Sequence, residues 1–130
     1  MMNYSFNKTI SGKSFEEALV YVTDMLKTEG FGIITEIDLQ KSFKEKINKD
    51  FRKYKILGAC NPGFAYKAVQ VEDSIGVFLP CNVVVQEHEN GTIEVMAVNP
   101  VAAMSSVDNK ALEPMALEIQ IALKKVIDKL

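Results

Sequence analysis

The clearest local signal of the fold lies between Val83 and Val98, which read VVVQEHENGTIEVMAV. Two runs rich in β-branched residues flank Asn90 and Gly91. Both central positions of a type I′ turn need a positive φ, which asparagine and glycine tolerate. The stretch therefore predicts a β-hairpin with a two-residue loop, and in that register Val85 lies opposite Met96.

The same register brings two polar pairs together at the open end of the hairpin. It places Asn82 opposite Asn99, and it places Cys81 beside Pro100. The sequence therefore predicts a corner at which Cys81-Asn82 and Asn99-Pro100 meet. Near the turn, the register sets Glu87 opposite Glu94.

Working outward from the hairpin, the apolar spacing predicts strands at 4–10, 31–37 and 54–59. Tyr4, Phe6 and Ile10 are expected on the buried face of the first strand. Helices are expected after residues that can cap a helix N-terminus, and a long amphipathic helix follows Pro114. The caps are Ser14, which forms a capping box with Glu17, then Asp38, and Asn61 followed by Pro62.

These elements give the order β-α-β-α-β-α-β-β-α. The sequence predicts a single α+β domain over residues 1–130, with a mainly antiparallel sheet and helices packed on it. The length of 130 residues and the hydrophobic content of 48% suit one core. No apolar run approaches the roughly 18 residues of a membrane helix, and the N-terminus has no signal-peptide pattern, so we expect a cytoplasmic protein with reduced thiols and no membrane partner.

The only two cysteines stand in similar surroundings. Each is followed by asparagine and flanked by proline, in Cys60-Asn61-Pro62 and Pro80-Cys81-Asn82. Proline fixes φ, asparagine offers two donors and an acceptor, and a thiol is a soft nucleophile or metal ligand. The two segments predict a polar site at a rigid corner.

The run from Tyr54 to Val85, with KILGACNP at 55–62 and LPCNVVV at 79–85, resembles the domain-of-unknown-function 302 family (DUF302). The resemblance extends to TEID at 35–38, to Val98-Asn99-Pro100 with Met104, and to 109–114, so it covers nearly the whole chain. It implies a small α+β homodimer whose activity is unassigned. Family members often carry Asp-Pro where this chain has Asn99-Pro100.

The thiols allow several interpretations. They can be small buried hydrophobes, which free cysteines often are. Cys60 and Cys81 can instead hold a soft or transition metal with Met104 or Met96, or form a redox pair if their Cα atoms lie within about 7 Å. Nucleophilic catalysis is disfavoured because the only histidine, His88, lies at the turn end of the hairpin, more than about 20 Å from Cys81.

Two further patterns have an ordinary structural explanation. Gly12-Lys13-Ser14 matches half of a phosphate-binding loop, but the first glycine is missing and Ser14 suits a helix cap. Residues 41–55 carry seven basic against two acidic side chains, whereas the whole chain has a net charge of −2. With Phe43, Ile47 and Phe51 at helical spacing, this segment is typical of a solvated helix face, so nucleic acid is not an expected partner.

The sequence therefore predicts a homodimeric binding module for a small ligand or a soft metal. The alternatives are a thiol-dependent enzyme and a purely structural or interaction domain. The candidate ligand-binding residues are Cys60, Asn61, Cys81, Asn82 and Asn99, and the candidate metal ligands are Cys60, Cys81 and Met104.

Overall fold

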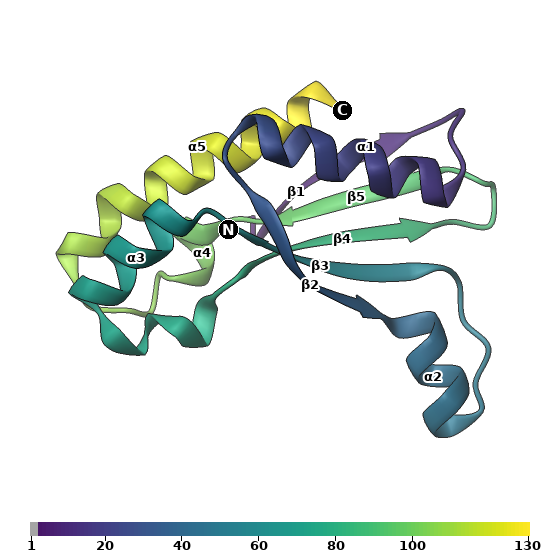
Figure 1. The fold of residues 1–130 in the computed structure, drawn as a ribbon, viewed down its shortest axis with the longest axis horizontal. Helices are drawn as coiled ribbons and strands as arrows, with labels where there is room; N and C mark the ends of the chain where they lie inside the picture. The colour runs from purple at the N-terminus through teal and green to yellow at the C-terminus, as the bar shows by residue number, and fades with distance from the viewer. Residues whose placement is uncertain (1–2) are drawn as a thin grey trace.

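The computed structural model describes residues 3–130, which form one five-stranded sheet with helices (Figure 1). The strands are β1 (Ser5–Ile10), β2 (Gly32–Asp38), β3 (Tyr54–Cys60), β4 (Cys81–Glu87) and β5 (Ile93–Val98). The helices are α1 (Phe15–Thr28), α2 (Leu39–Ile47), α3 (Pro62–Val71), α4 (Pro100–Ala103) and α5 (Glu113–Lys129), with 3₁₀ turns η1 (Asp73–Phe78) and η2 (Lys110–Leu112).

The predicted α+β class and element order are confirmed, and so are the local signals that set the helix starts. Ser14 and Glu17 form the capping box of α1 at 3.1 and 2.9 Å. Asp38 caps α2 through the Lys41 N–H, and Asn61 caps α3. The short α4, η1 and η2 were not predicted, and Tyr4 precedes β1 with 81% of its surface exposed. It is therefore not on the buried face.

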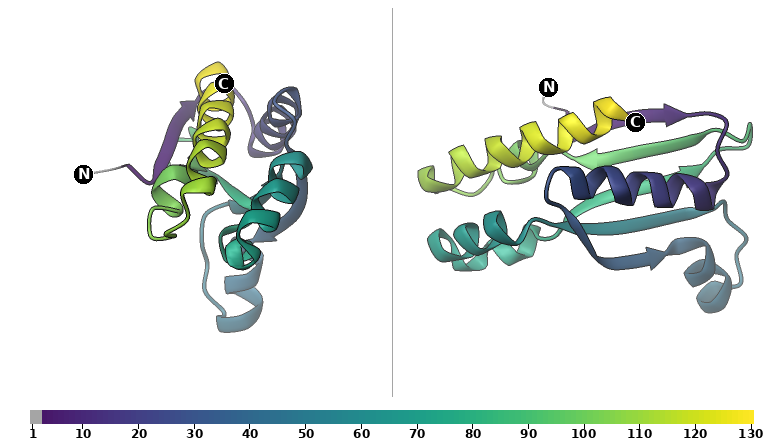
Figure 2. Two further views of the ribbon diagram at one scale, coloured as in Figure 1. Left: turned by 90° about the vertical axis from the view of Figure 1, so that its left-hand side faces the viewer. Right: turned by 45° about the horizontal axis from the view of Figure 1, so that its top comes forward.

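The sheet is antiparallel, with strand order β1-β5-β4-β3-β2. Helices α1 and α5 lie side by side on one face, as the views in Figures 1 and 2 show. The alternate side chains that point toward these helices form the main core, with Val83, Val85 and Val95 fully buried against Leu26 and Leu123. A second, smaller cluster lies beyond the end of the sheet, where α5 meets α3 and η2.

The predicted hairpin exists, but its predicted register is wrong by one residue. Val85 pairs with Val95 and Val84 with Met96, because the loop has three residues between His88 and Thr92. Gly91 takes the positive φ of 83° that such a loop requires. The predicted pairing of Glu87 with Glu94 is therefore also wrong, since Glu94 pairs with Gln86.

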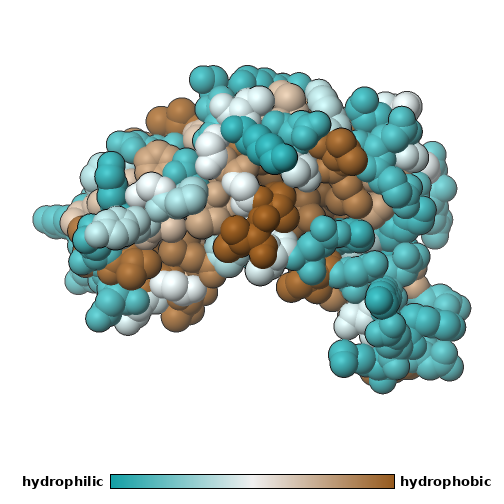
Figure 3. Space-filling model, in the orientation of Figure 1, coloured by the Kyte–Doolittle hydropathy of each residue, from teal (hydrophilic) through white to brown (hydrophobic). Residues whose placement is uncertain are grey.

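Within residues 3–130, no helix lies across the other face of the sheet (Figure 1). One row on this face crosses four strands through the paired residues Ile37, Ile56, Val84 and Met96. Ile37 is 48% exposed, and the other three are half-buried. Figure 3 shows hydrophobic side chains gathered along the hollowed side of the molecule beneath the sheet.

The basic segment forms α2 and the chain that follows it, and this helix projects from the end of the sheet (Figure 1). Several of its basic side chains pair with nearby acids, as in Lys44 with Asp50 at 3.0 Å and Lys55 with Glu36 at 2.7 Å. Phe43 and Phe51 pack edge to face, with ring centroids 5.2 Å apart. These contacts agree with the interpretation of a solvated helix anchored by aromatic residues. None of the described helices is long and apolar enough to span a membrane.

Candidate functional site

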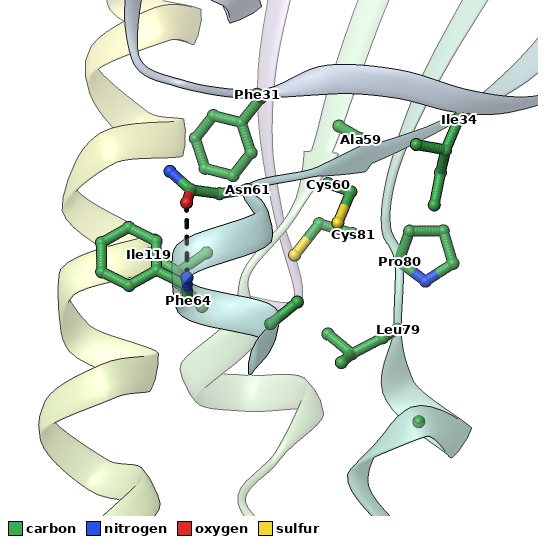
Figure 4. Close-up of a pocket in the computed structure, with 12 residues that line it drawn as sticks. Phe31, Ile34, Ala59, Cys60, Asn61, Phe64, Leu79, Pro80, Cys81 and Ile119 are labelled. Carbon is green, nitrogen blue, oxygen red and sulfur yellow. Dashed lines mark hydrogen bonds between the residues drawn. The ribbon is translucent and has the colours of Figure 1, made fainter. Parts of the chain in front are cut away.

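Both thiols line one open cavity of about 230 Å³ at the end of the sheet. The cavity lies where the ends of β2, β3 and β4 meet α3, η1 and α5, and Figure 4 shows both sulfur atoms at its centre. Cys81 is 5% exposed and Cys60 is half-buried. The other lining residues are mostly apolar: Phe31, Ile34, Ala59, Phe64, Ala65, Gly76, Leu79, Pro80 and Ile119, together with Asn61.

The chain turns at Cys60, and this turn explains how two cysteines from neighbouring strands reach one cavity. Ala59 is paired directly with Cys81, so a regular strand would point Cys60 to the opposite face. Cys60 is the last residue of β3, however, and Asn61 begins α3 by accepting a hydrogen bond from the Phe64 N–H at 3.3 Å. Strand and helix therefore both contribute to the cavity wall.

Gly58 keeps this end of the sheet closely packed. A Cβ on Gly58 would collide with the Thr35 hydroxyl and would lie 2.7 Å from Pro80 Cγ. Only glycine leaves room there for β2 and for the residue that precedes β4. The close approach sets where Pro80 and Cys81 enter the cavity.

Burial keeps Cys81 in its thiol form. Burial, and secondarily the charge of the neighbouring Cys60, raises the pKa of Cys81 from its ordinary value of 9.0 to about 11. A thiol is a poor nucleophile and a poor metal ligand until it loses its proton. The cavity is therefore lined mostly by apolar side chains, and the Cys81 thiol in its wall is uncharged at neutral pH.

Two of the predicted site residues lie elsewhere. Asn82 is exposed on the uncovered face of the sheet, paired with Gly58 in the ladder. Asn99 is buried, and its side chain makes structural hydrogen bonds: Oδ1 accepts from the Val101 N–H at 3.1 Å and from Gln120 Nε2 at 3.0 Å, and Nδ2 donates to the carbonyl of Asn3. The expectation of one corner holding both asparagines with the thiols is corrected, because alternation along β4 turns Asn82 away.

The methionines considered as metal ligands also lie away from the thiols. Met104 belongs to the second cluster and lines a separate cavity of about 410 Å³ between α4, η2 and α5. Met96 lies on the uncovered face of the sheet. Among residues 3–130, no three histidine, cysteine or acidic side chains are grouped so that they could hold one metal ion. The proposed ligand set is thereby reduced to Cys60 and Cys81.

A polar network near the hairpin turn was not predicted. His88 Nε2 lies 2.9 Å from Glu94 Oε1, and Arg52 Nε donates to Gln86 Oε1 at 2.8 Å. The hydrogen bonds from His88 and then from Asn7 hold the pKa of Glu94 below its usual range. The sequence did not reveal this network because the predicted register was off by one residue, and only the observed register pairs Gln86 with Glu94.

The apolar walls of the cavity were also missed. Phe31, Phe64 and Ile119 come from three separate segments, and nothing in their spacing links them. Only Phe31 carries a local signal, because it follows Gly30, whose φ of 84° ends α1.

The comparisons with known proteins agree with this fold. The family model described as "Domain of unknown function DUF302" matches residues 6–130. The chain is similar to the crystal structure of an uncharacterized conserved DUF302 protein from Bacillus stearothermophilus, with 27% identity, a TM-score of 0.88 and 97% of each chain covered. No curated protein matches the sequence.

Proposed function

The chain belongs to the DUF302 family, and we propose that it binds a small, mostly apolar molecule in the cavity around Cys60 and Cys81. The observation that carries the proposal is the cavity itself: it is open, it has a volume of about 230 Å³, and both thiols line it. Ligand sites are usually concave and mostly apolar, with a few polar groups that fix orientation.

The size of the cavity points to a ligand of one or two rings. A closed apolar cavity of roughly 150 Å³ is large enough to hold benzene. The walls supply aromatic and aliphatic surface from Phe31, Phe64 and Ile119, and the thiols are the polarisable groups at the centre. A neutral aromatic molecule fits this lining better than a charged one.

A soft metal is the second ligand class that two thiols suit. Against it stands the burial of Cys81, which raises the pKa of its thiol to about 11 and so opposes the thiolate that a metal needs. The same burial disfavours a thiol-dependent enzyme, because a protonated thiol is a poor nucleophile. His88 cannot serve as the base, because it is paired with Glu94 near the hairpin turn and is not among the residues that line the cavity.

We also propose that two copies pair through the uncovered face of the sheet. The observation that favours this is the row of Ile37, Ile56, Val84 and Met96, which leaves apolar surface exposed on the face without helices. An antiparallel sheet can leave one face in solvent, but that face is then normally polar, whereas a contiguous exposed apolar patch marks an interaction surface. The family resemblance points the same way.

Titration of the reduced protein with indole tests the ligand proposal. We expect saturable binding, seen as chemical-shift changes at residues that line the cavity. The variant Ala65→Phe fills the cavity from α3 and should weaken binding by about tenfold or more. Ala111→Phe, at an exposed position on η2, is the matched control and should bind like the wild type.

Native mass spectrometry of freshly purified protein separates the ligand classes. A retained organic mass supports the proposal, whereas a metal that is lost in Cys60→Ser and Cys81→Ser together would replace it with the soft-metal interpretation. Indole binding that is absent, or that is equal in Ala65→Phe and the wild type, would leave the thiol corner as a structural feature.

A further inference from the structure

We propose that Cys60 and Cys81 are a site of reversible oxidation, at which a hydroperoxide converts the two thiols into a disulfide inside the cavity. The proposal goes beyond ligand binding, and only the effect of oxidation on a bound ligand rests on the proposed function. It starts from the placement of both sulfur atoms in one cavity (Figure 4).

The sheet register supplies the geometry. Ala59 and Cys81 are directly paired across β3 and β4, and Cys60 is the next residue along β3. Paired Cα atoms in an antiparallel ladder lie about 5 Å apart, and one residue along a strand adds about 3.4 Å at right angles. The Cα atoms of Cys60 and Cys81 are therefore about 6 Å apart, within the roughly 4.4 to 6.8 Å that a disulfide spans.

The direction of the side chains also permits the bond. In a regular strand Cys60 would point away from Cys81, but Cys60 is the last residue of β3, where it pairs with Gly32, and the next residue, Asn61, already caps α3. Both thiols consequently border the same open space, and neither needs to cross the sheet to meet the other.

The two thiols have different accessibility, which gives each a distinct role. Cys60 is half-buried and meets a peroxide first, whereas Cys81 is 5% exposed. The Cys60 thiolate attacks one peroxide oxygen, so that an S–O bond forms, the O–O bond breaks, and the leaving hydroxide takes a proton to become water. This step gives a sulfenic acid on Cys60.

The Cys81 sulfur then attacks the Cys60 sulfur. The S–S bond forms, the S–O bond breaks, and the departing hydroxide leaves as water with the proton from Cys81. In total, two thiols and one hydrogen peroxide give one disulfide and two waters, and the thiols supply the two electrons that reduce the peroxide. A dithiol reductant then restores the two thiols by disulfide exchange and is itself oxidised to a disulfide.

The disulfide would change the cavity directly. It fixes the two sulfur atoms about 2.05 Å apart and joins the end of β3 to the start of β4. Where the reduced protein binds a ligand, oxidation removes both thiols from the lining and fixes the wall between them.

Treatment of the reduced wild-type protein with hydrogen peroxide tests the proposal. We expect the monomer mass to fall by two hydrogens, and trypsin without reductant to release peptides 56–67 and 68–110 joined. In Cys81→Ser, the Cys60 sulfenic acid has no partner and should react with dimedone. In Cys60→Ser, Cys81 should remain unmodified while the protein is folded.

Three results would overturn the proposal: disulfides between two chains, a Cys60 sulfinic acid without a disulfide in the wild type, or two thiols that resist peroxide in the folded protein but react in urea. Indole titration of the oxidised and reduced forms separates this proposal from the proposed function. A disulfide that forms in a protein that never binds indole leaves the oxidation site intact and removes only the ligand.

Discussion

At the scale of single residues, Cys81 should make stability depend on alkaline pH. Burial raises its pKa to about 11 from 9.0, so between these values the unfolded chain has lost the proton that the folded chain keeps. The contribution of this thiol to the free energy of unfolding is fully present below pH 9.0. It falls as pH rises toward 11, and the total loss is about 2 to 3 kcal/mol. Urea unfolding of Cys81→Ala should show a flatter pH profile than the wild type across this window, and equal profiles would contradict the buried thiol.

Also at this scale, Asn99 should matter far more than Asn82. The buried Asn99 amide accepts at Oδ1 and donates at Nδ2, so Asn99→Ala leaves buried polar groups without partners and should cost about 2 to 3 kcal/mol. The exposed Asn82 is the matched control, and Asn82→Ala should change stability by less than about 0.5 kcal/mol. The denaturant midpoints of the two variants measure these losses of stability. Equal losses in Asn99→Ala and Asn82→Ala would contradict the prediction and give Asn82 a structural role.

At the scale of elements, the approach of β2 to β3 depends on Gly58. The Cβ of Gly58→Ala would collide with the Thr35 side chain and with Pro80, so we expect a loss of about 1 to 3 kcal/mol. Gly32, in the neighbouring strand, has open space where its Cβ would be, and Gly32→Ala should be close to neutral. Thermal unfolding of the two variants compares them directly, and a neutral Gly58→Ala would show that the strands can separate without cost.

At the scale of the whole molecule, the uncovered face should decide the oligomeric state. We expect a homodimer at micromolar concentration in sedimentation equilibrium. Ile37→Lys places a charge in the apolar row and should raise the dissociation constant about tenfold or more. Val20→Lys changes an exposed apolar residue on α1, on the opposite side of the sheet, and should leave the dimer unchanged. A monomeric wild type, or identical dimers from both variants, would contradict the proposed interface.

Sequence patterns alone were enough to predict the strands, the longer helices and their order, but not the short α4, η1 and η2. Helix starts at Ser14, Asp38 and Asn61 depend on hydrogen bonds to backbone groups three residues away, so neighbouring residues are enough to specify them. The strands and the hairpin also follow from local apolar patterns and from Asn90-Gly91. The family followed from motifs that extend over most of the chain.

The tertiary structure alone decided the register, the covered face and the site. Whether two or three residues form the hairpin loop depends on how β4 and β5 pair with the rest of the sheet, and one residue of difference turns each side chain to the other face. The register also moves Asn99 out of its predicted place opposite Asn82, which alternation along β4 already turns away from the thiols. The cavity walls at Phe31, Phe64 and Ile119 come from segments that only packing brings together, because α1 and α5 cover one face of the sheet and leave its end open beside Cys60 and Cys81.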